Sequence, residues 1–317
     1  MTLTSAYKED VSTADKIKAL KERLLDRTQP LAKRMRVVCS LRGVPGTDTV
    51  DALAACLTDE SALLRHEVAY ALGQKEEISA VPVLTALLKN DQDSMVRHEA
   101  AEALGAIGVP EALKVLEEFE SCDVEEVRHT CQLALDRIRW ANKKHGGDTS
   151  KANESLQQKK FASIDPAPPA DASLTTAELV DKLMDSSLPL FERYGFLFAL
   201  RDRGTEEAAL GLAKVLLEDK SSAVLRHEIA FVLGQIQNKA ALSALETSLR
   251  NVEENQMVRH EAAEAIGAIA EEAANPLLEE FAKDKNQVVA ESCIIALDIS
   301  DYWNDDSQFQ YAVVEVE

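Results

Sequence analysis

The sequence predicts an all-α protein, a helical solenoid that consists of two similar halves. Ala, Leu and Glu are abundant among the 317 residues while aromatic residues make up only 5%, which favours helices over sheets. A long internal repeat relates the two halves, and a shorter period of 32 or 33 residues runs within each half. Apolar residues make up 46% of the chain, which is enough for ordinary globular cores.

The long repeat relates two stretches in the first part of the chain to two in the second. Residues 95–107 and 257–269 are identical except for one exchange of Leu for Ile. Residues 64–74 and 225–235 share the pattern Leu-Arg-His-Glu-x-Ala-x-x-Leu-Gly-Gln. The chain is therefore an internal duplication.

The shorter period divides each half into four units. His66 and His98 lie 32 residues apart, and His227 and His260 lie 33 residues apart, a spacing typical of solenoids. The recurring pattern Val-Arg-x-x-Ala-x-x-Ala-Leu-Gly resembles the second helix of short HEAT-like repeats. We therefore expect an α-solenoid of short HEAT-like helical-hairpin repeats, with two four-repeat halves.

Each unit is predicted to contain two helices, as the third unit illustrates. Pro82 opens the first helix, and Asn90 and Asp91 end it. Asp93 and Ser94 are candidate N-caps of the second helix, whose apolar residues recur at helical spacing. Such a hairpin buries its apolar face only when neighbouring units stack on it.

Two stretches fall outside the repeats. Periodicity fails over residues 142–173, where polar residues and Gly precede three prolines, a composition typical of a flexible linker. Residues 304–317 form an acidic, irregular tail. The N-terminal half is then residues 1–141 and the C-terminal half residues 174–303. A linker of this length allows the halves to face each other with pseudo-two-fold symmetry.

The composition excludes several classes of protein. With a net charge of −20 and no basic cluster, neither nucleic acid nor an anionic membrane is an expected partner. The charge suits a basic partner, although solubility explains it equally well. Five cysteines without a Cys-x-x-Cys pattern indicate neither a disulfide framework nor a thiolate zinc site. Without a signal-peptide core or a membrane-length apolar run, we expect a cytoplasmic protein.

Four of the six histidines are followed by glutamate and occupy the same position in the repeat. One such pair is unremarkable, because the helix macrodipole favours an acidic residue in the first turn. A position that serves repeat packing would recur in all eight units, whereas these pairs are confined to the second and third units of each half. We therefore predict a functional cluster where the central units face each other. The pairs are His66-Glu67, His98-Glu99, His227-Glu228 and His260-Glu261.

These residue types indicate a metal site. Neighbouring helices lie about 8–10 Å apart, so histidines on two of them can reach one ion. Two histidines and one carboxylate hold non-haem iron and leave positions open for oxygen. Two facing halves predict a dinuclear site, and one carboxylate per half is left to bridge, to orient a ligand or to bind a cationic group of the substrate. Ligand type alone does not fix the metal.

Two further sets of residues keep alternatives open. The zinc-hydrolase motif needs a second His four residues after the first, and Tyr70, Glu102, Phe231 and Glu264 stand there instead. Glu102 and Glu264 share a helix face with their histidines and are reserve ligands. An arginine precedes each His-Glu pair, and it either binds an anion or pairs with an acidic residue of the next repeat. These arginines are Arg65, Arg97, Arg226 and Arg259.

The four Arg-His-Glu sites, their spacing and the two duplicated motifs resemble those of the deoxyhypusine hydroxylase family. The resemblance covers the chain outside the linker and the tail. It implies a HEAT-repeat fold, two ferrous ions as cofactors and O₂ as co-substrate, and hence a monooxygenase among the oxidoreductases. The implied partner is translation initiation factor 5A bearing deoxyhypusine, a lysine extended by an aminobutyl group, which is hydroxylated to hypusine. We expect the chain to be a monomer.

The resemblance also implies roles for the eight paired residues, all of which are candidate metal ligands. His66, His98, His227 and His260 are implied as ligands, with Glu99 and Glu261 completing one set in each half. Glu67 and Glu228 are then the better candidates for catalysis and for binding the amino groups of the substrate.

Three other functions remain as alternatives. A non-catalytic HEAT-repeat scaffold for protein interactions would contain no stoichiometric metal. A protein similar to the bilin lyases would not require four His-Glu pairs in register. A metal-dependent hydrolase on the same scaffold would differ in colour and in its independence of oxygen.

Overall fold

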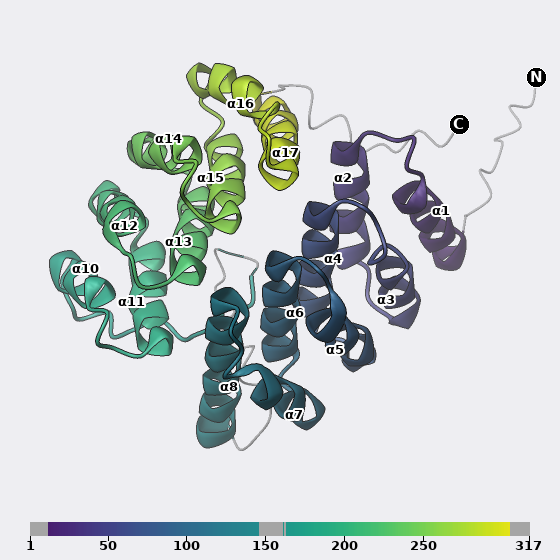
Figure 1. The fold of residues 1–317 in the computed structure, drawn as a ribbon, viewed down its shortest axis with the longest axis horizontal. Coiled ribbons are helices and arrows are strands. Elements are labelled where there is room, and N and C mark those ends of the chain that lie inside the picture. The colour runs from purple at the N-terminus through teal and green to yellow at the C-terminus, as the bar shows by residue number, and fades with distance from the viewer. Residues whose placement is uncertain (1–11, 146–160, 162, 305–317) are drawn as a thin grey trace, which may run out of the picture.

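The computed structural model describes residues 12–145, 161 and 163–304, and within these ranges it contains helices and no strands (Figure 1). The all-helical class and the helical hairpins predicted from the sequence are confirmed. Residues 146–160 and 162 of the predicted linker lie outside the described residues, as does the predicted tail beyond Asn304. None of the helices in the described ranges is both long and apolar enough to cross a membrane.

The helices form four consecutive hairpins in each half. Those of the N-terminal half are α1 (Thr13–Leu25), α2 (Leu31–Arg42), α3 (Thr47–Ala54), α4 (Ala62–Gln74), α5 (Val81–Asn90), α6 (Ser94–Ile107), α7 (Pro110–Phe119) and α8 (Glu125–His145). Those of the C-terminal half are α10 (Thr176–Met184), α11 (Leu190–Arg203), α12 (Glu206–Glu218), α13 (Ala223–Ile236), α14 (Leu242–Arg250), α15 (Gln256–Ile269), α16 (Asn275–Phe281) and α17 (Gln287–Asn304). Three short 3₁₀ helices precede α5, α14 and α16, at Ile78–Ala80, Lys239–Ala241 and Glu272–Ala274.

The hairpins stack so that their second helices form an inner layer and their first helices an outer one (Figure 1). Apolar residues between the layers make two cores, one for each half. Within the inner layer, neighbouring helices approach closely: a Cβ atom at Gly105 of α6 would lie 2.7 Å from that of Ala134 in α8. This spacing brings successive inner helices, and the side chains on them, close together.

The four helices that carry the His-Glu pairs all begin in the same way. Polar side chains accept a hydrogen bond from a backbone N–H in the first turn of each helix and so satisfy a group that would otherwise lack a partner. The sequence expectation of an N-cap at Asp93 is confirmed. Each histidine stands five residues after its cap, so each points from the same place on its helix. The caps are Ser61, Asp93, Ser222 and Asn255.

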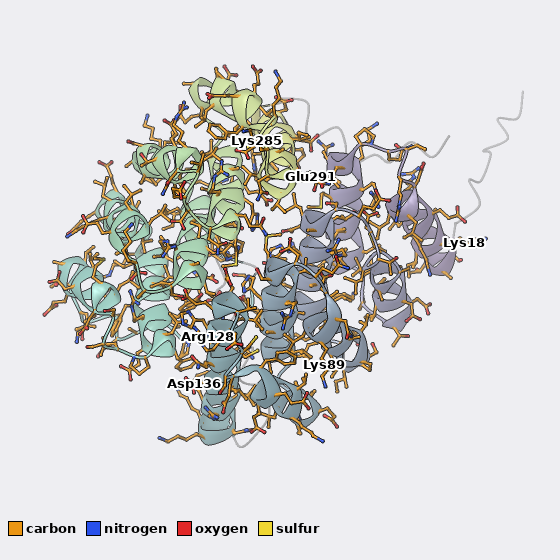
Figure 2. The ribbon with its side chains drawn as sticks, viewed as in Figure 1. Lys18, Lys89, Arg128, Asp136, Lys285 and Glu291 are labelled. Carbon is orange, nitrogen blue, oxygen red and sulfur yellow. The ribbon has the colours of Figure 1, made fainter. Side chains whose placement is uncertain are left out.

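The two halves meet at both ends, so that the inner helices enclose the middle of the molecule (Figure 1). At one junction α8 packs against α11 and α13, where His129 Nδ1 lies 3.0 Å from Ser222 Oγ. At the other, α17 packs against α2 and α4, and Ser61 donates to Glu291 over 2.6 Å. Figure 2 shows Glu291 at this junction, whereas Lys18 and Lys89 lie on the outer edge. The pseudo-two-fold relation between whole halves stays a prediction.

The described end of the predicted linker is packed against the inner helices. Phe161 and residues 163–170, which we call the strap, include buried side chains, and Asp165 is only 2% exposed. Over these residues the expectation of a flexible linker is wrong. The composition suggested flexibility because local sequence does not show the distant partners that bury a polar segment. Helix α8 also extends to His145, beyond the boundary expected at residue 141.

Candidate metal centre

The four paired histidines converge where α4, α6, α13 and α15 face one another. Within the halves, the ring centroids of His66 and His98 lie 5.9 Å apart and those of His227 and His260 5.3 Å apart. Between the halves, His66 lies 5.1 Å from His260 and His98 lies 5.2 Å from His227. All four side chains are buried. Histidines 194 and 129 positions apart in sequence thus form one cluster.

One glutamate lies between the two histidines of each half. Glu99 Oε2 is 3.2 Å from Nε2 of His66 and 3.7 Å from Nε2 of His98. In the other half, Glu261 Oε2 is 3.4 Å from Nε2 of His227 and 3.9 Å from Nε2 of His260. The two halves therefore present matching sets of two imidazoles and one carboxylate, the arrangement typical of non-haem iron.

Hydrogen bonds to Nδ1 orient two of these histidines. Thr130 Oγ1 donates its proton to the carbonyl of Glu126 and so accepts from Nδ1 of His98, 2.9 Å away. The carboxylate of Glu67 is likewise an acceptor for Nδ1 of His66, at 3.1 Å. In both cases the proton on Nδ1 leaves a lone pair on Nε2, the atom near Glu99. Such partners commonly fix the ring of a metal-binding histidine.

A small cavity of about 70 Å³ lies beside the histidines and is rich in carboxylates. Glu67 and Glu228 line it, together with Glu102 and Glu264, the reserve ligands of the sequence analysis. The rings of Tyr70 and Phe231 also line it and meet edge to face, with centroids 6.1 Å apart. The cavity therefore combines carboxylates with an apolar aromatic wall. Glu264 Oε1 lies 3.6 Å from Nδ1 of His260.

The burial of these residues provides a test of whether a metal suits the cluster. A buried polar atom without a partner costs about 1–3 kcal/mol, and native structures contain few of them. Here they concentrate in the cluster, and a divalent cation would give the unprotonated ring nitrogens among them a partner. The residues present thus suit a metal. The buried ring nitrogens without a hydrogen-bond partner are His66 Nε2, His98 Nε2, and both nitrogens of His227 and His260.

Burial and repulsion between like groups dominate the electrostatics of the cluster. Burial lowers the pKa of His98 and His260 well below 6.5, and the neighbouring histidines lower it further. Burial also acts on His66, but its hydrogen bond to the carboxylate of Glu67 and the negative charges of Glu99 and Glu67 outweigh burial and raise its pKa well above 6.5.

The carboxyl groups of the cavity respond in the opposite direction. Burial, followed by repulsion from Glu99, raises the pKa of Glu102 to about 8. Burial and neighbouring carboxylates also raise the pKa of Glu228 and Glu264 well above 4.5. A cation in this cavity would favour the ionised carboxylates. Both metal ions and amino groups of a substrate meet this requirement.

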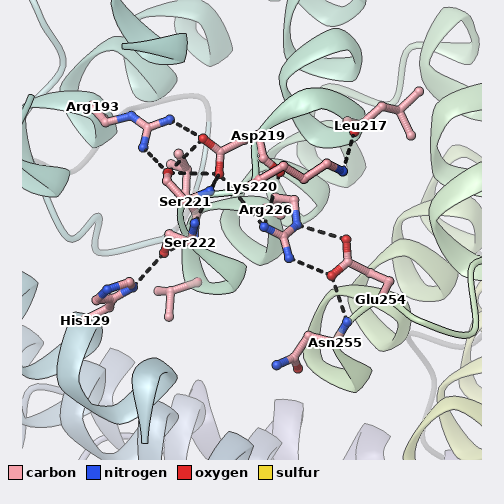
Figure 3. A network of polar contacts seen from close by, with 12 residues as sticks. His129, Arg193, Leu217, Asp219, Lys220, Ser221, Ser222, Arg226, Glu254 and Asn255 are labelled. Atoms are coloured by element: carbon pink, nitrogen blue, oxygen red, sulfur yellow. Dashed lines mark hydrogen bonds and ion pairs between the residues drawn. The ribbon is translucent and has the colours of Figure 1, made fainter. Parts of the chain in front are cut away.

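The arginines that precede the His-Glu pairs serve the scaffold. Arg65 pairs with Asp91, Arg226 with Glu254 and Arg259 with Asp284, each in the following repeat. Arg97 instead donates to the carbonyl of Leu88 and lies over the ring of Phe119. Ion pairing is therefore confirmed for three of the four arginines. Figure 3 shows the pair between Arg226 and Glu254 at the start of α13.

Thr130 was not among the site residues predicted from the sequence. Its signal was present, because Thr130 occupies the position in the fourth unit that glutamate holds in the second and third units. Ser292 occupies the same position in the last unit of the other half, where it is buried. Its hydroxyl group lowers the pKa of Glu264. The frame of the repeat thus identifies both residues once the cluster is known.

Comparisons with known proteins agree with this architecture. The family described as HEAT repeats matches residues 17–94, 50–136 and 193–298. Deoxyhypusine hydroxylase of Dictyostelium discoideum is 50% identical over 95% of this chain and 94% of its own length. The Homo sapiens enzyme is 45% identical over 95% of this chain and 96% of its own length.

The chain belongs to the deoxyhypusine hydroxylase family. This confirms the resemblance inferred from the four Arg-His-Glu sites. A solved structure of human deoxyhypusine hydroxylase in complex with glycerol has a TM-score of 0.85 and 45% identity to this chain. It covers 91% of this chain and 97% of the human one, so the fold is shared over nearly the whole family member.

Proposed function

We propose that this chain is a di-iron monooxygenase that hydroxylates the deoxyhypusine side chain of translation initiation factor 5A to hypusine. The proposal rests on the region where α4, α6, α13 and α15 face one another. There, each half contributes a set of two histidines and one glutamate. The names of the chain's relatives support this choice of substrate.

Each half would hold one ferrous ion. His66, His98 and Glu99 would bind the first, and His227, His260 and Glu261 the second. When bound, iron would supply the redox chemistry by which one oxygen atom of O₂ enters a C–H bond while the other is reduced to water with two electrons from an external donor, chemistry that side chains do not provide.

The cavity beside the cluster would bind the aminobutyl extension of the substrate. Glu67 and Glu228 would accept hydrogen bonds from its amino groups, because buried carboxylates form strong charge-assisted bonds with cationic donors. The rings of Tyr70 and Phe231 would pack against the methylene groups. Both contacts hold the chain beside the metal ligands and exclude bulk water from them.

Whole-chain properties support the remaining parts of the proposal. The net charge of −20 would attract a cationic substrate segment. All five cysteines are free and three of them are buried, as expected in a reducing compartment. We propose that the chain acts in the cytoplasm as a monomer.

The test is a hydroxylation assay with ferrous iron, isotope-labelled O₂ and the deoxyhypusine form of factor 5A. We expect one labelled oxygen atom in the hypusine formed. His98→Ala should abolish turnover, whereas His129→Ala, at the equivalent position of the next unit, should retain it. If the wild-type chain forms no product and His98→Ala is as stable as the wild type, the result would favour a non-catalytic scaffold. Product formed without oxygen would favour a hydrolase.

A further inference from the structure

The strap is held by the two glutamines that end the duplicated motif. Gln74, the last residue of α4, accepts a hydrogen bond from the backbone N–H of Ile164 over 2.8 Å. Gln235, at the equivalent position of α13, donates from Nε2 to Ser163 Oγ over 3.1 Å. Each glutamine stands eight residues after a histidine of the cluster, about 12 Å along the helix axis. The duplication thus supplies one anchor from each half for two successive residues of the strap.

A buried ion pair fixes the middle of the strap. The carboxylate of Asp165 accepts from both terminal nitrogens of Arg201 in α11, over 2.7 and 2.6 Å. Arg201 is fully buried and lies over the ring of Phe161. Arg137 of α8 donates from Nε to the carbonyl of Asp165 over 3.2 Å. Residues of both halves therefore converge on Asp165.

The surface of α11 is shaped to let the strap pass. The N–H of Ala170 donates to the carbonyl of Gly195 over 2.8 Å. A Cβ atom at Gly195 would lie only 3.1 Å from the carbonyl oxygen of Pro168. The strap consequently lies against the helix backbone itself.

The strap also borders the carboxylates of the site. Ile164 and Pro166 line a small cavity together with Glu102, which also lines the cavity beside the histidines. The negative charge of Asp165 raises the pKa of Glu228, and the positive charge of Arg201 lowers it. Glu102 is therefore a shared neighbour of the strap and of the cavity beside the histidines.

We infer that the strap is a positioning element that ties the two halves together behind the histidine cluster, with Gln74 and Gln235 as its anchors. Because the strap contacts both halves, it fixes the distance between the two sets of candidate metal ligands and the positions of the carboxylates beside them. The expected effect of the strap on kcat for hydroxylation rests on the proposed function. The structural consequence, a rigid strap that retains the metal, is independent of the substrate.

The anchors allow a milder test than the ion pair, because removing one partner of a buried pair leaves an uncompensated charge and can prevent folding. Gln74→Met removes one hydrogen bond at nearly constant volume. Gln235→Met removes two, the one to Ser163 and the one that Gln235 accepts from Arg201 over 3.4 Å. The two variants are made singly and together. Gln74→Glu keeps the acceptor for the N–H of Ile164 and should rescue Gln74→Met. Gln237→Met is the matched control, because its amide donates to the carbonyl of Ala268 and not to the strap.

Three quantities are measured on the full chain loaded with ferrous iron: amide hydrogen exchange of the strap, release of iron to a ferrous chelator, and kcat and KM for hydroxylation. In the double variant we expect strap exchange and iron release to rise by roughly 10-fold, since both anchoring bonds are lost. We expect kcat to fall roughly 10- to 100-fold with KM nearly unchanged, as misplaced reacting groups cause. Gln237→Met should match the wild type in all three.

Two results would overturn the inference. One is fast strap exchange with wild-type iron release and kcat, which would make the strap a covering only. The other is reduced kcat with unchanged strap exchange, which would mean that the glutamines act by another route. If the wild-type chain hydroxylates no substrate, the proposed function fails. Iron release from the double variant then still decides about the strap, since a wild-type rate would refute it.

Discussion

Among single residues, the partners of the histidine Nδ1 atoms decide how the cluster can bind a metal. His98 is held by Thr130 and His66 by Glu67, and in each case Nε2 remains available. A glutamate that orients a histidine in this way is less suited to bind the same ion. The geometry therefore supports the division in the N-terminal half, with Glu99 as a ligand and Glu67 as a substrate-binding residue. The duplication extends this division to Glu261 and Glu228 in the other half.

This division predicts different losses for the two kinds of glutamate. Glu99→Gln and Glu261→Gln should each remove one of two bound iron ions, because an amide oxygen is a much weaker ligand than a carboxylate. Glu67→Gln and Glu228→Gln should retain both ions and still lose most of their activity. Elemental analysis of the purified variants measures the first effect and the hydroxylation assay the second. Equal iron loss in all four variants would contradict the division.

Thr130 should tune the affinity of one half for its ion. Thr130→Val keeps the shape of the side chain but removes the acceptor for His98 Nδ1, and such changes weaken metal binding by roughly 10- to 100-fold. Thr130→Ser keeps the hydroxyl and should bind iron like the wild type. Anaerobic titration with ferrous iron measures both. Unchanged affinity in Thr130→Val would show that His98 needs no such partner.

Among the helices, a polar network fixes where α13 begins and hence where His227 lies. Asp219 accepts from Arg193 over 2.6 Å and from the backbone N–H of Ser222, which caps α13 (Figure 3). Burial would raise the pKa of Asp219, but the hydrogen bonds and charge of Arg193 outweigh it and hold the pKa below 3.8. Ser222 also lies within hydrogen-bond distance of His129 in the other half.

This network predicts a pH-dependent part of the stability. A carboxyl group with a lowered pKa in the folded state stabilises the fold above its ordinary pKa, and this contribution is lost as the pH falls through the lowered value. Asp219→Asn should therefore reduce the free energy of unfolding at pH 7 and flatten its fall below about pH 4. Denaturant unfolding across pH measures both, with the exposed Asp301→Asn as control. An unchanged acid limb in Asp219→Asn would disprove the assignment.

At the scale of the whole molecule, most features that recur in both halves could be predicted from the sequence. The helical hairpins, the HEAT-like repeats and the family follow from the repeat frame, because packing and site positions recur at a fixed spacing. The same frame singled out the four His-Glu pairs, because they occur only in the central units, and the structure brings their histidines together. Their role as a metal site stays a prediction.

The rest depends on contacts that no repeat encodes. The strap was expected to be a flexible linker, because the partners of Asp165 and Ile164 lie tens of residues away. The role of Thr130 became evident only when its distance to His98 was known. Local composition shows neither kind of contact, since both require the halves to be already folded against each other.

The location of the metal is the most direct test of the whole proposal. Crystals of the chain loaded anaerobically with ferrous iron would show it by anomalous diffraction at the iron edge. We expect two peaks at the junction of the halves, each about 2 Å from the Nε2 atoms of one half and from Glu99 or Glu261. A single peak, or peaks away from the four histidines, would contradict a di-iron centre built from the duplicated motif.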